Sequence, residues 1–178
     1  KAFRDICDDL EILEKYEIDI PFFTQIGASA LTDKTIDVPT GGVEAGVPIT
    51  YVPFRNGIFL SITAAIAEKE EATAMYIGVV QEDSSGYPDC TDEFIADMKK
   101  AINQGTKKDT HIDILTPLVH LSKAQIVQEA MKLNVPLEHT WSCYKEEDEA
   151  CGICDSCRLR LNGFKLANQI DPIKYKAL

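Results

Sequence analysis

The sequence has few basic side chains and no long apolar run. Its 178 residues include 18 Lys or Arg against 29 Asp or Glu, which leaves a formal net charge of −11. A surface of this sign repels phosphate backbones, so long nucleic acid is not expected as a direct partner. The longest nearly apolar run, "GIFLSITAAIA", is too short to cross a bilayer, so no membrane role is indicated.

A secretory leader, internal repeats and low-complexity segments are also lacking. Without a leader, the expected location is the cytoplasm, where thiols stay reduced and disulfides are disfavoured. What is present fits a soluble globular protein, with 45% hydrophobic and 26% charged residues. A chain of this length can bury a core of its own, so it needs no covalent staples.

Apolar periodicity predicts alternating helices and strands along most of the chain. The helices are expected at residues 2–16, 56–72, 91–103 and 122–134, and the strands at residues 18–24, 74–80 and 111–118. One strand, "AMYIGVV", is apolar throughout, which is typical of a strand buried on both faces. Strands separated by helices predict an α/β fold with a parallel sheet and crossover helices.

Local signals mark helix starts and a loop. Asn56 is available to cap one helix, and Ser122 with Gln125 predicts a capping box on another. Residues 26–50 are rich in Gly, Thr, Asp and Pro and lack a sustained period, which predicts a long loop.

The composition changes near His139, where the apolar periodicity gives way to cysteines. We therefore expect two parts, an α/β domain over residues 1–138 and a small lobe with a C-terminal helix over residues 139–178. Ligands of a parallel α/β sheet collect at the carboxyl ends of its strands, so functional residues are expected in the loops that follow strands.

Four of the six cysteines lie between residues 143 and 157. They are Cys143, Cys151, Cys154 and Cys157, in the spacing C-x7-C-x2-C-x2-C. Such a spacing suits thiolates that converge on one ion at about 2.3 Å. Four soft ligands favour zinc, with an iron–sulfur centre, or reduced or disulfide-paired cysteines in a loop, as the alternatives. If all four bind zinc, the tetrahedral shell is filled and the metal is structural.

Three polar side chains at helix starts are candidates for anion binding. Arg55 and Asn56 begin a helix whose free N–H groups and dipole favour a phosphate or carboxylate. A surface Arg55 and a capping Asn56 are the equally weighted alternative. Lys123 lies in the first turn of another helix, where a cation opposes the dipole unless an anion is near.

The segment "QEDSSGYPDC" directly follows the apolar strand that ends at residue 80. It brings polar groups to the strand end, where this architecture builds its sites. The candidates are Gln81, Asp83, Ser85, Gly86, Tyr87 and Asp89. The alternative is structural, with Asp89 as a helix cap and Tyr87 in a hydrophobic corner.

Other chemistry-bearing residues are interpreted as structural. The three histidines, His111, His120 and His139, show no mutual metal-ligand spacing, and none is a site candidate. Cys7 is most simply a small apolar residue of the first helix. Cys90 also lies outside the cysteine spacing and is less easily dismissed.

An ordered set of motifs resembles the 7-cyano-7-deazaguanine synthase family, the queuosine-pathway enzymes also called QueC or ExsB. The motifs are "SALTD", "TYVPFRNGIFLSITAAIA", "QEDSSGYPDC", "TPLVHLSKAQIV" and "WSCYKEEDEACGICDSCRLR". The match runs from about residue 28 to residue 164. "SGYPDC" together with the four-cysteine spacing is far more specific than either alone.

The resemblance implies an N-type ATP-pyrophosphatase-like, Rossmann-like domain, a structural zinc, ATP with Mg²⁺, and a homodimer. The implied ligase converts 7-carboxy-7-deazaguanine and ammonia to 7-cyano-7-deazaguanine through an adenylated carboxylate and an adenylated amide. By placement, Arg55, Asn56 and Lys123 face phosphates or the activated carboxyl, with Arg55 and Lys123 as the catalytic pair. The deazaguanine is then surrounded by Gln81, Asp83, Ser85, Gly86, Tyr87 and Asp89. The acidic charge agrees, because another enzyme modifies the tRNA later.

One family feature is not found in the sequence. The family begins with a strand and an "SGGxDS" phosphate loop, and these 178 residues contain no such motif. We therefore expect an amino-terminal segment to be missing and this chain alone to be inactive. Two rival functions remain, an ATP-dependent tRNA thiolation enzyme with an iron–sulfur or sulfur-carrying cysteine cluster, and a non-catalytic zinc-ribbon interaction module.

Overall fold

The structure is a computed structural model that describes residues 1–42, 46–81 and 86–176. The chain forms two compact units, one of Lys1–Val43 with Ser122–Leu178 and one of Glu44–Leu121. None of the helices in the described ranges has the length and apolar character needed to span a bilayer.

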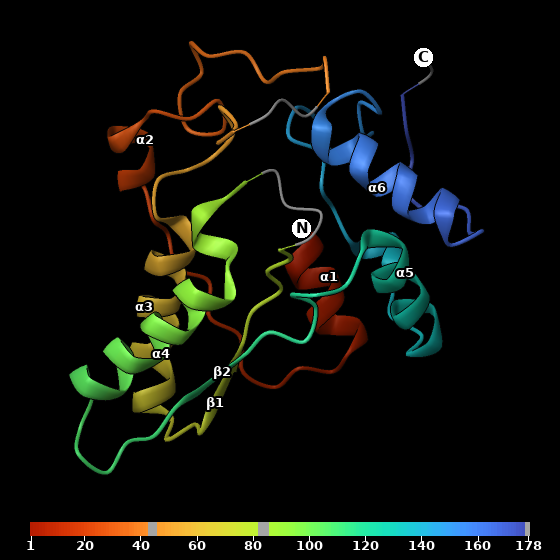
Figure 1. The fold of residues 1–178 in the computed structure, drawn as a ribbon. Coiled ribbons are helices and arrows are strands. Elements are labelled where there is room, and N and C mark those ends of the chain that lie inside the picture. Colours follow the sequence, from red (N-terminus) through yellow and green to blue (C-terminus); the bar gives the residue numbers. More distant parts are fainter. Residues whose placement is uncertain (43–45, 82–85, 177–178) are drawn as a thin grey trace. The chain divides into compact units, whose positions relative to one another are not determined.

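The unit Glu44–Leu121 contains the sheet. Among the described residues, β1 (Ala74–Tyr76) and β2 (Asp113–Leu115) pair in parallel, with Met75 opposite Ile114. Helix α3 (Arg55–Lys69) precedes β1, and α4 (Asp92–Gly105) forms the crossover between the strands. The two helices contact each other and pack on the strands (Figure 1). The predicted α/β class with a parallel sheet is confirmed.

The core of this unit lies between the helices and one face of the sheet. Met75 and Ile114 point into it together with Leu60 of α3 and Ile95 of α4. Along β1, Ala74 is half-buried, Met75 is buried and Tyr76 is 73% exposed. The prediction that this strand is buried on both faces is therefore wrong for Tyr76, because alternate side chains of a strand point to opposite faces.

The other unit is mainly helical. It contains α1 (Ala2–Asp9), α2 (Phe22–Ile26), α5 (Lys123–Lys132) and α6 (Asp155–Leu166). A short 3₁₀ turn, η2 (Leu137–His139), follows α5. Helices α5 and α6 lie beside each other (Figure 1). The division at residues 138 and 139 stays a prediction, although α5 and α6, assigned to different parts from the sequence, pack within one unit.

The predicted capping box is confirmed. The Ser122 hydroxyl accepts from the Gln125 N–H at 3.3 Å, and Gln125 Oε1 accepts from the Ser122 N–H at 2.9 Å. The loop expected at 26–50 is also confirmed, since the described residues 27–42 and 46–50 form turns and bends without a helix or strand. Both features follow from local hydrogen bonding and turn chemistry.

Two local predictions are wrong. The strand expected at 18–24 does not form. Residues 18–20 are irregular, and α2 begins after Pro21. Pro21 has no N–H to give to a sheet, and its fixed φ suits a helix start. The helix expected over 2–16 ends at Asp9, where consecutive carboxylates oppose the negative end of the helix dipole. Glu11 then takes a left-handed φ of 51°.

Gly163→Ala is expected to destabilise the unit that contains α5 and α6. A Cβ at Gly163 would lie 2.8 Å from Lys123 Cβ and 3.2 Å from the Lys123 carbonyl carbon, so the start of α5 must move. Overpacking of this kind costs about 1–3 kcal/mol, and urea denaturation should show that loss in the free energy of unfolding. Gly41→Ala, whose Cβ meets nothing within 4 Å, is the matched control. An unchanged midpoint for Gly163→Ala would contradict this close approach.

Candidate functional site

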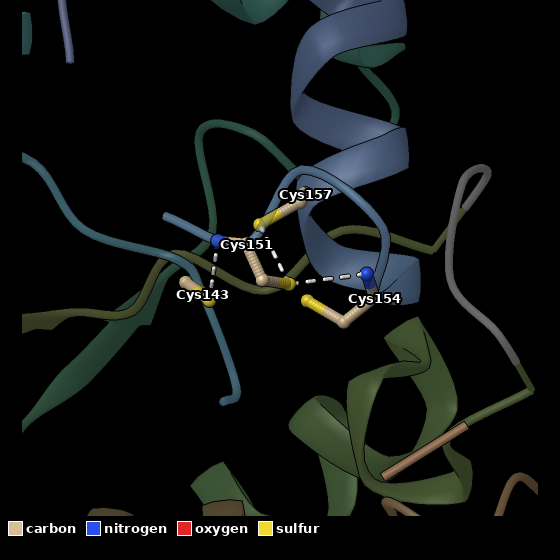
Figure 2. A group of neighbouring side chains, drawn as sticks. All are labelled: Cys143, Cys151, Cys154 and Cys157. Atoms are coloured by element: carbon tan, nitrogen blue, oxygen red, sulfur yellow. Dashed lines mark hydrogen bonds between the residues drawn. The ribbon is translucent and has the colours of Figure 1, made fainter. Parts of the chain in front are cut away.

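The four predicted ligand cysteines converge on one point. The Sγ atoms of Cys143, Cys151, Cys154 and Cys157 all lie within 4.8 Å of one another. Figure 2 shows their side chains turned toward a common centre. All six cysteines lie in the described part of the chain, and all are free thiols. The predicted grouping of these four residues is therefore confirmed.

The local backbone explains how the thiols come together. Cys154 is the N-cap of α6 and Cys157 lies in its first turn, whereas Cys151 precedes a tight turn at Gly152 with φ 72°. Within that turn the Cys154 N–H donates to Cys151 Sγ at 3.3 Å (Figure 2). The Cys151 N–H in turn donates to Cys143 Sγ at 3.4 Å. These N–H groups stabilise negative charge on sulfur.

The electrostatics of the group favour a bound cation. Burial opposes ionisation of Cys151, but hydrogen bonds from the N–H groups of Cys154 and Ile153, together with those of the Cys143 and Cys154 side chains, lower its pKa to about 7. Burial raises the pKa of Cys154 and of Cys157. A metal ion supplies the positive charge that lets such neighbouring thiols be thiolates together.

The spacing of the sulfurs fits one ion. Metal–sulfur bonds of about 2.3 Å in a tetrahedron place sulfurs about 3.8 Å apart. The Sγ atoms of Cys151 and Cys157 are 4.0 Å apart. Four thiolates complete a tetrahedral shell and leave no position for water or substrate, so a metal held here is structural.

Apolar packing and one arginine join the cysteine group to its surroundings. Trp141, Ala150 and Val38 pack in the same cluster as the thiols. Arg158 on α6 donates through Nη2 to the Thr40 carbonyl at 2.7 Å. The hydrogen bond to Thr40 and the packing of the half-buried Val38 thus hold one part of the predicted 26–50 loop against the cysteine group.

The start of α3 is held by a residue distant in sequence. The Asn56 N–H donates to Asp89 Oδ2 at 2.9 Å, and Asn56 Nδ2 donates to the Asp89 carbonyl at 3.1 Å and to Cys90 Sγ at 3.2 Å. Asn56 is 7% exposed and Asp89 is 3% exposed. The prediction that Asn56 caps α3 is wrong, because Phe54 is the N-cap and Asp89 supplies the carboxylate that meets the helix.

A second contact ties the same two segments together. The Tyr87 hydroxyl lies 2.9 Å from Thr50 Oγ1, and the rings of Tyr87 and Tyr51 are 5.8 Å apart. Gly86 has φ 76°, and a Cβ there would lie 2.8 Å from the Gly46 carbonyl oxygen. Thr50 and Tyr51 were not among the predicted site residues, although they begin the motif that contains Arg55.

The remaining site candidates are placed as follows. Gln81 Oε1 accepts from the Asp92 N–H at 3.2 Å, at the start of α4. Arg55 is half-buried in the first turn of α3, and Lys123 begins α5 in the other unit. Asp83 and Ser85 lie outside the described residues. The structure thus brings Asn56, Tyr87 and Asp89 together within one unit, and their ligand-binding roles stay predictions.

Asp89→Ala is expected to lower the free energy of unfolding by about 1–3 kcal/mol, because the buried Asn56 N–H loses its acceptor. Asp89→Asn keeps an acceptor oxygen and loses only the negative charge. It should lower the free energy of unfolding by about 1 kcal/mol or less, which is what a negative charge at a helix N-terminus contributes. Urea denaturation followed by circular dichroism measures both. Asp97→Ala, at a side chain 67% exposed on α4, is the control. Equal effects of Asp89→Ala and Asp97→Ala would refute the capping role.

Comparisons with known proteins identify the family. A family model described as queuosine biosynthesis protein QueC matches residues 1–168. The chain is 85% identical over 176 residues to a 7-cyano-7-deazaguanine synthase of Aliarcobacter butzleri, covering 99% of this chain and 77% of that protein. It is 69% identical over 176 residues to the protein of the same name from Nautilia profundicola, covering 99% and 79%. Because the family model matches nearly all residues and two relatives are 69% and 85% identical over 99% of the chain, the chain belongs to the QueC family of queuosine biosynthesis proteins.

Proposed function

We propose that the protein is a 7-cyano-7-deazaguanine synthase, an ATP-dependent carbon–nitrogen ligase of queuosine biosynthesis. The observation that carries this proposal is the 85% identity, over 99% of the chain, to a protein of that name. The four converging thiols support it, because the resemblance seen in the sequence implies a metal site at these cysteines. The substrates are 7-carboxy-7-deazaguanine, ammonia and ATP.

The chemistry follows from the poor reactivity of a carboxylate. A carboxylate oxygen attacks the α-phosphorus of ATP and expels pyrophosphate, and ammonia then displaces AMP to give the amide. The amide oxygen attacks a further ATP with loss of pyrophosphate and a proton. Departure of AMP and of the remaining N–H proton leaves the nitrile. Positive charge near the phosphorus stabilises each transition state.

Arg55 and Lys123 are assigned to the phosphates and the activated carboxyl. Each lies in the first turn of a helix, where free N–H groups and the dipole favour anions. Their cationic side chains add to this field, and the arginine fork suits two phosphate oxygens. Mg²⁺ completes the neutralisation of ATP in this proposal, which also includes a homodimer and a cytoplasmic location.

The ring of the substrate is assigned to the segment that begins at Gln81. Hydrogen bonds join Asn56 to Asp89 and Tyr87 to Thr50. They give this side of the proposed substrate site a fixed shape. The assignment also includes four residues at or near the strand end, Gln81, Asp83, Ser85 and Gly86. A rigid wall of hydrogen-bonding groups is what recognition of a flat heterocycle requires.

The metal in the proposal is zinc, and purified protein is expected to contain about one zinc per chain. Cys154→Ser should lose the metal and unfold the lobe, because folding of a cysteine-rich lobe is coupled to metal binding. Metal analysis and circular dichroism measure the two effects. Cys90→Ser alters a buried cysteine outside the group and should keep the metal. Protein purified without chelator that holds well under one equivalent would contradict the zinc site.

The activity is tested with purified full-length protein supplied with 7-carboxy-7-deazaguanine, ammonium, ATP and Mg²⁺. Mass spectrometry should detect the nitrile and AMP. Arg55→Ala should lower kcat by at least about tenfold if the guanidinium stabilises charge at phosphorus. Arg4→Ala, which removes an exposed partner of Glu17, is the control. No nitrile or AMP from folded, zinc-loaded protein would overturn the function, and sulfur transfer to tRNA would favour the thiolation alternative.

A further inference from the structure

Residues 171–176 lie against the loop that carries the predicted metal ligands. Within residues 171–176, here called the tail segment, the Lys174 carbonyl accepts from the Ala150 N–H at 2.9 Å. The Lys176 N–H donates back to the Ala150 carbonyl at 2.9 Å, which forms a parallel bridge. Ala150 is 0% exposed and directly precedes Cys151. The tail segment therefore fixes the backbone next to Cys151, one of the predicted metal ligands.

Two side chains of the tail segment add an apolar cover. Ile173 and Tyr175 pack in the same cluster as the buried thiols of Cys151, Cys154 and Cys157. A chelator that takes the metal, or a reagent that modifies thiols, reaches these buried groups only after local opening of the structure. Since the tail segment contributes both backbone and side-chain contacts, its displacement is a route to that opening.

A buried ion pair holds the tail segment in place. Arg160 Nε donates to Asp171 Oδ2 at 2.7 Å, and Nη2 donates to Oδ1 at 2.9 Å. The two side chains are 12% and 3% exposed. The Tyr175 hydroxyl donates to Asp171 Oδ2 at 2.6 Å, and the Ile173 N–H donates to Oδ1 at 3.3 Å. The Asp171 carboxylate thus organises the turn that directs the tail toward the cysteines.

The same guanidinium reaches other parts of the unit. Arg160 Nη1 donates to Thr140 Oγ1 at 2.7 Å, and Nη2 donates to the Leu137 carbonyl at 3.3 Å. It also lies over the Phe164 ring at 5.3 Å from the centroid. Cys157 lies one turn earlier on the same helix. The Arg160 side chain therefore connects the tail segment to the 3₁₀ turn Leu137–His139 and to α6, which carries Cys157.

We propose that the tail segment covers the cysteine site and that Arg160 and Asp171 are positioning residues that set how fast the metal is lost. The inference rests on the metal site of the proposed function and is independent of the ligase activity. The tail segment follows residues 1–168, which the family model matches. None of the four residues that build the network is a metal ligand; they are Arg160, Asp171, Ile173 and Tyr175.

The test measures transfer of zinc from the loaded protein to a coloured chelator in excess. Tyr175→Phe removes one hydrogen bond to a carboxylate and should speed release about five- to tenfold. Asp171→Asn leaves the buried Arg160 charge unbalanced and should speed it by more than tenfold. Arg160→Lys keeps the charge without the fork and should be intermediate. Tyr76→Phe, at an exposed ring in the other unit, should release zinc at the wild-type rate.

A second measurement separates covering from general destabilisation. Hydrogen exchange should rise in residues 171–176 and 143–157 of Tyr175→Phe and remain unchanged in the unit Glu44–Leu121. Wild-type release and exchange in folded Tyr175→Phe would overturn the proposal, even if Asp171→Asn fails to fold. If the purified protein holds no metal, the zinc site fails separately. Faster alkylation of the four thiols in Tyr175→Phe would then still support the cover, and an unchanged rate would refute it.

Discussion

The convergence of four thiols on one point is the constraint on which the lobe depends. Between Cys143 and Cys151 the chain reads "YKEEDEA", which offers little apolar surface for a core. Thiolates held this close repel one another unless a cation lies among them. A metal ion held by the four thiols would join the loop at Cys143, the turn at Cys151 and the start of α6. The contacts that surround the thiols follow from that junction.

In the unit Glu44–Leu121, the carboxylate of Asp89 has a comparable structural role. Asp89 satisfies the N-terminus of α3 from 33 residues away. Phe54, just before the helix, has φ 54°, and its N–H donates to the Tyr51 hydroxyl at 2.9 Å. A left-handed non-glycine residue persists only where its neighbours hold it, and such strain gathers at functional sites. Tyr51 and Asp89 thus fix the backbone on either side of Arg55, and with it the direction in which the Arg55 side chain projects.

Features set by neighbours in sequence could be predicted, whereas those set by distant partners could not. The capping box of Ser122 and the C-x2-C turns depend on residues a few positions apart, and both are confirmed. The role of Asp89 depends on a segment far away in the chain, so the sequence suggested Asn56 as the cap. The exposure of Tyr76 likewise depends on which sheet face the helices cover. The strand expected at 18–24 had the right composition, but Pro21 favours a helix start.

The geometry of the thiols also bears on what the protein does. In a four-iron cluster, iron and sulfide atoms separate the cysteine sulfurs and hold them farther apart than a single ion does. Sulfurs within 4.8 Å of one another therefore favour one metal ion over such a cluster and weaken the thiolation alternative. A metal ion bound by all four thiolates could not polarise a substrate, so in the proposed function the charge that activates ATP comes from other groups. For this reason the proposed function assigns the phosphate chemistry to two cationic side chains at helix starts, Arg55 and Lys123.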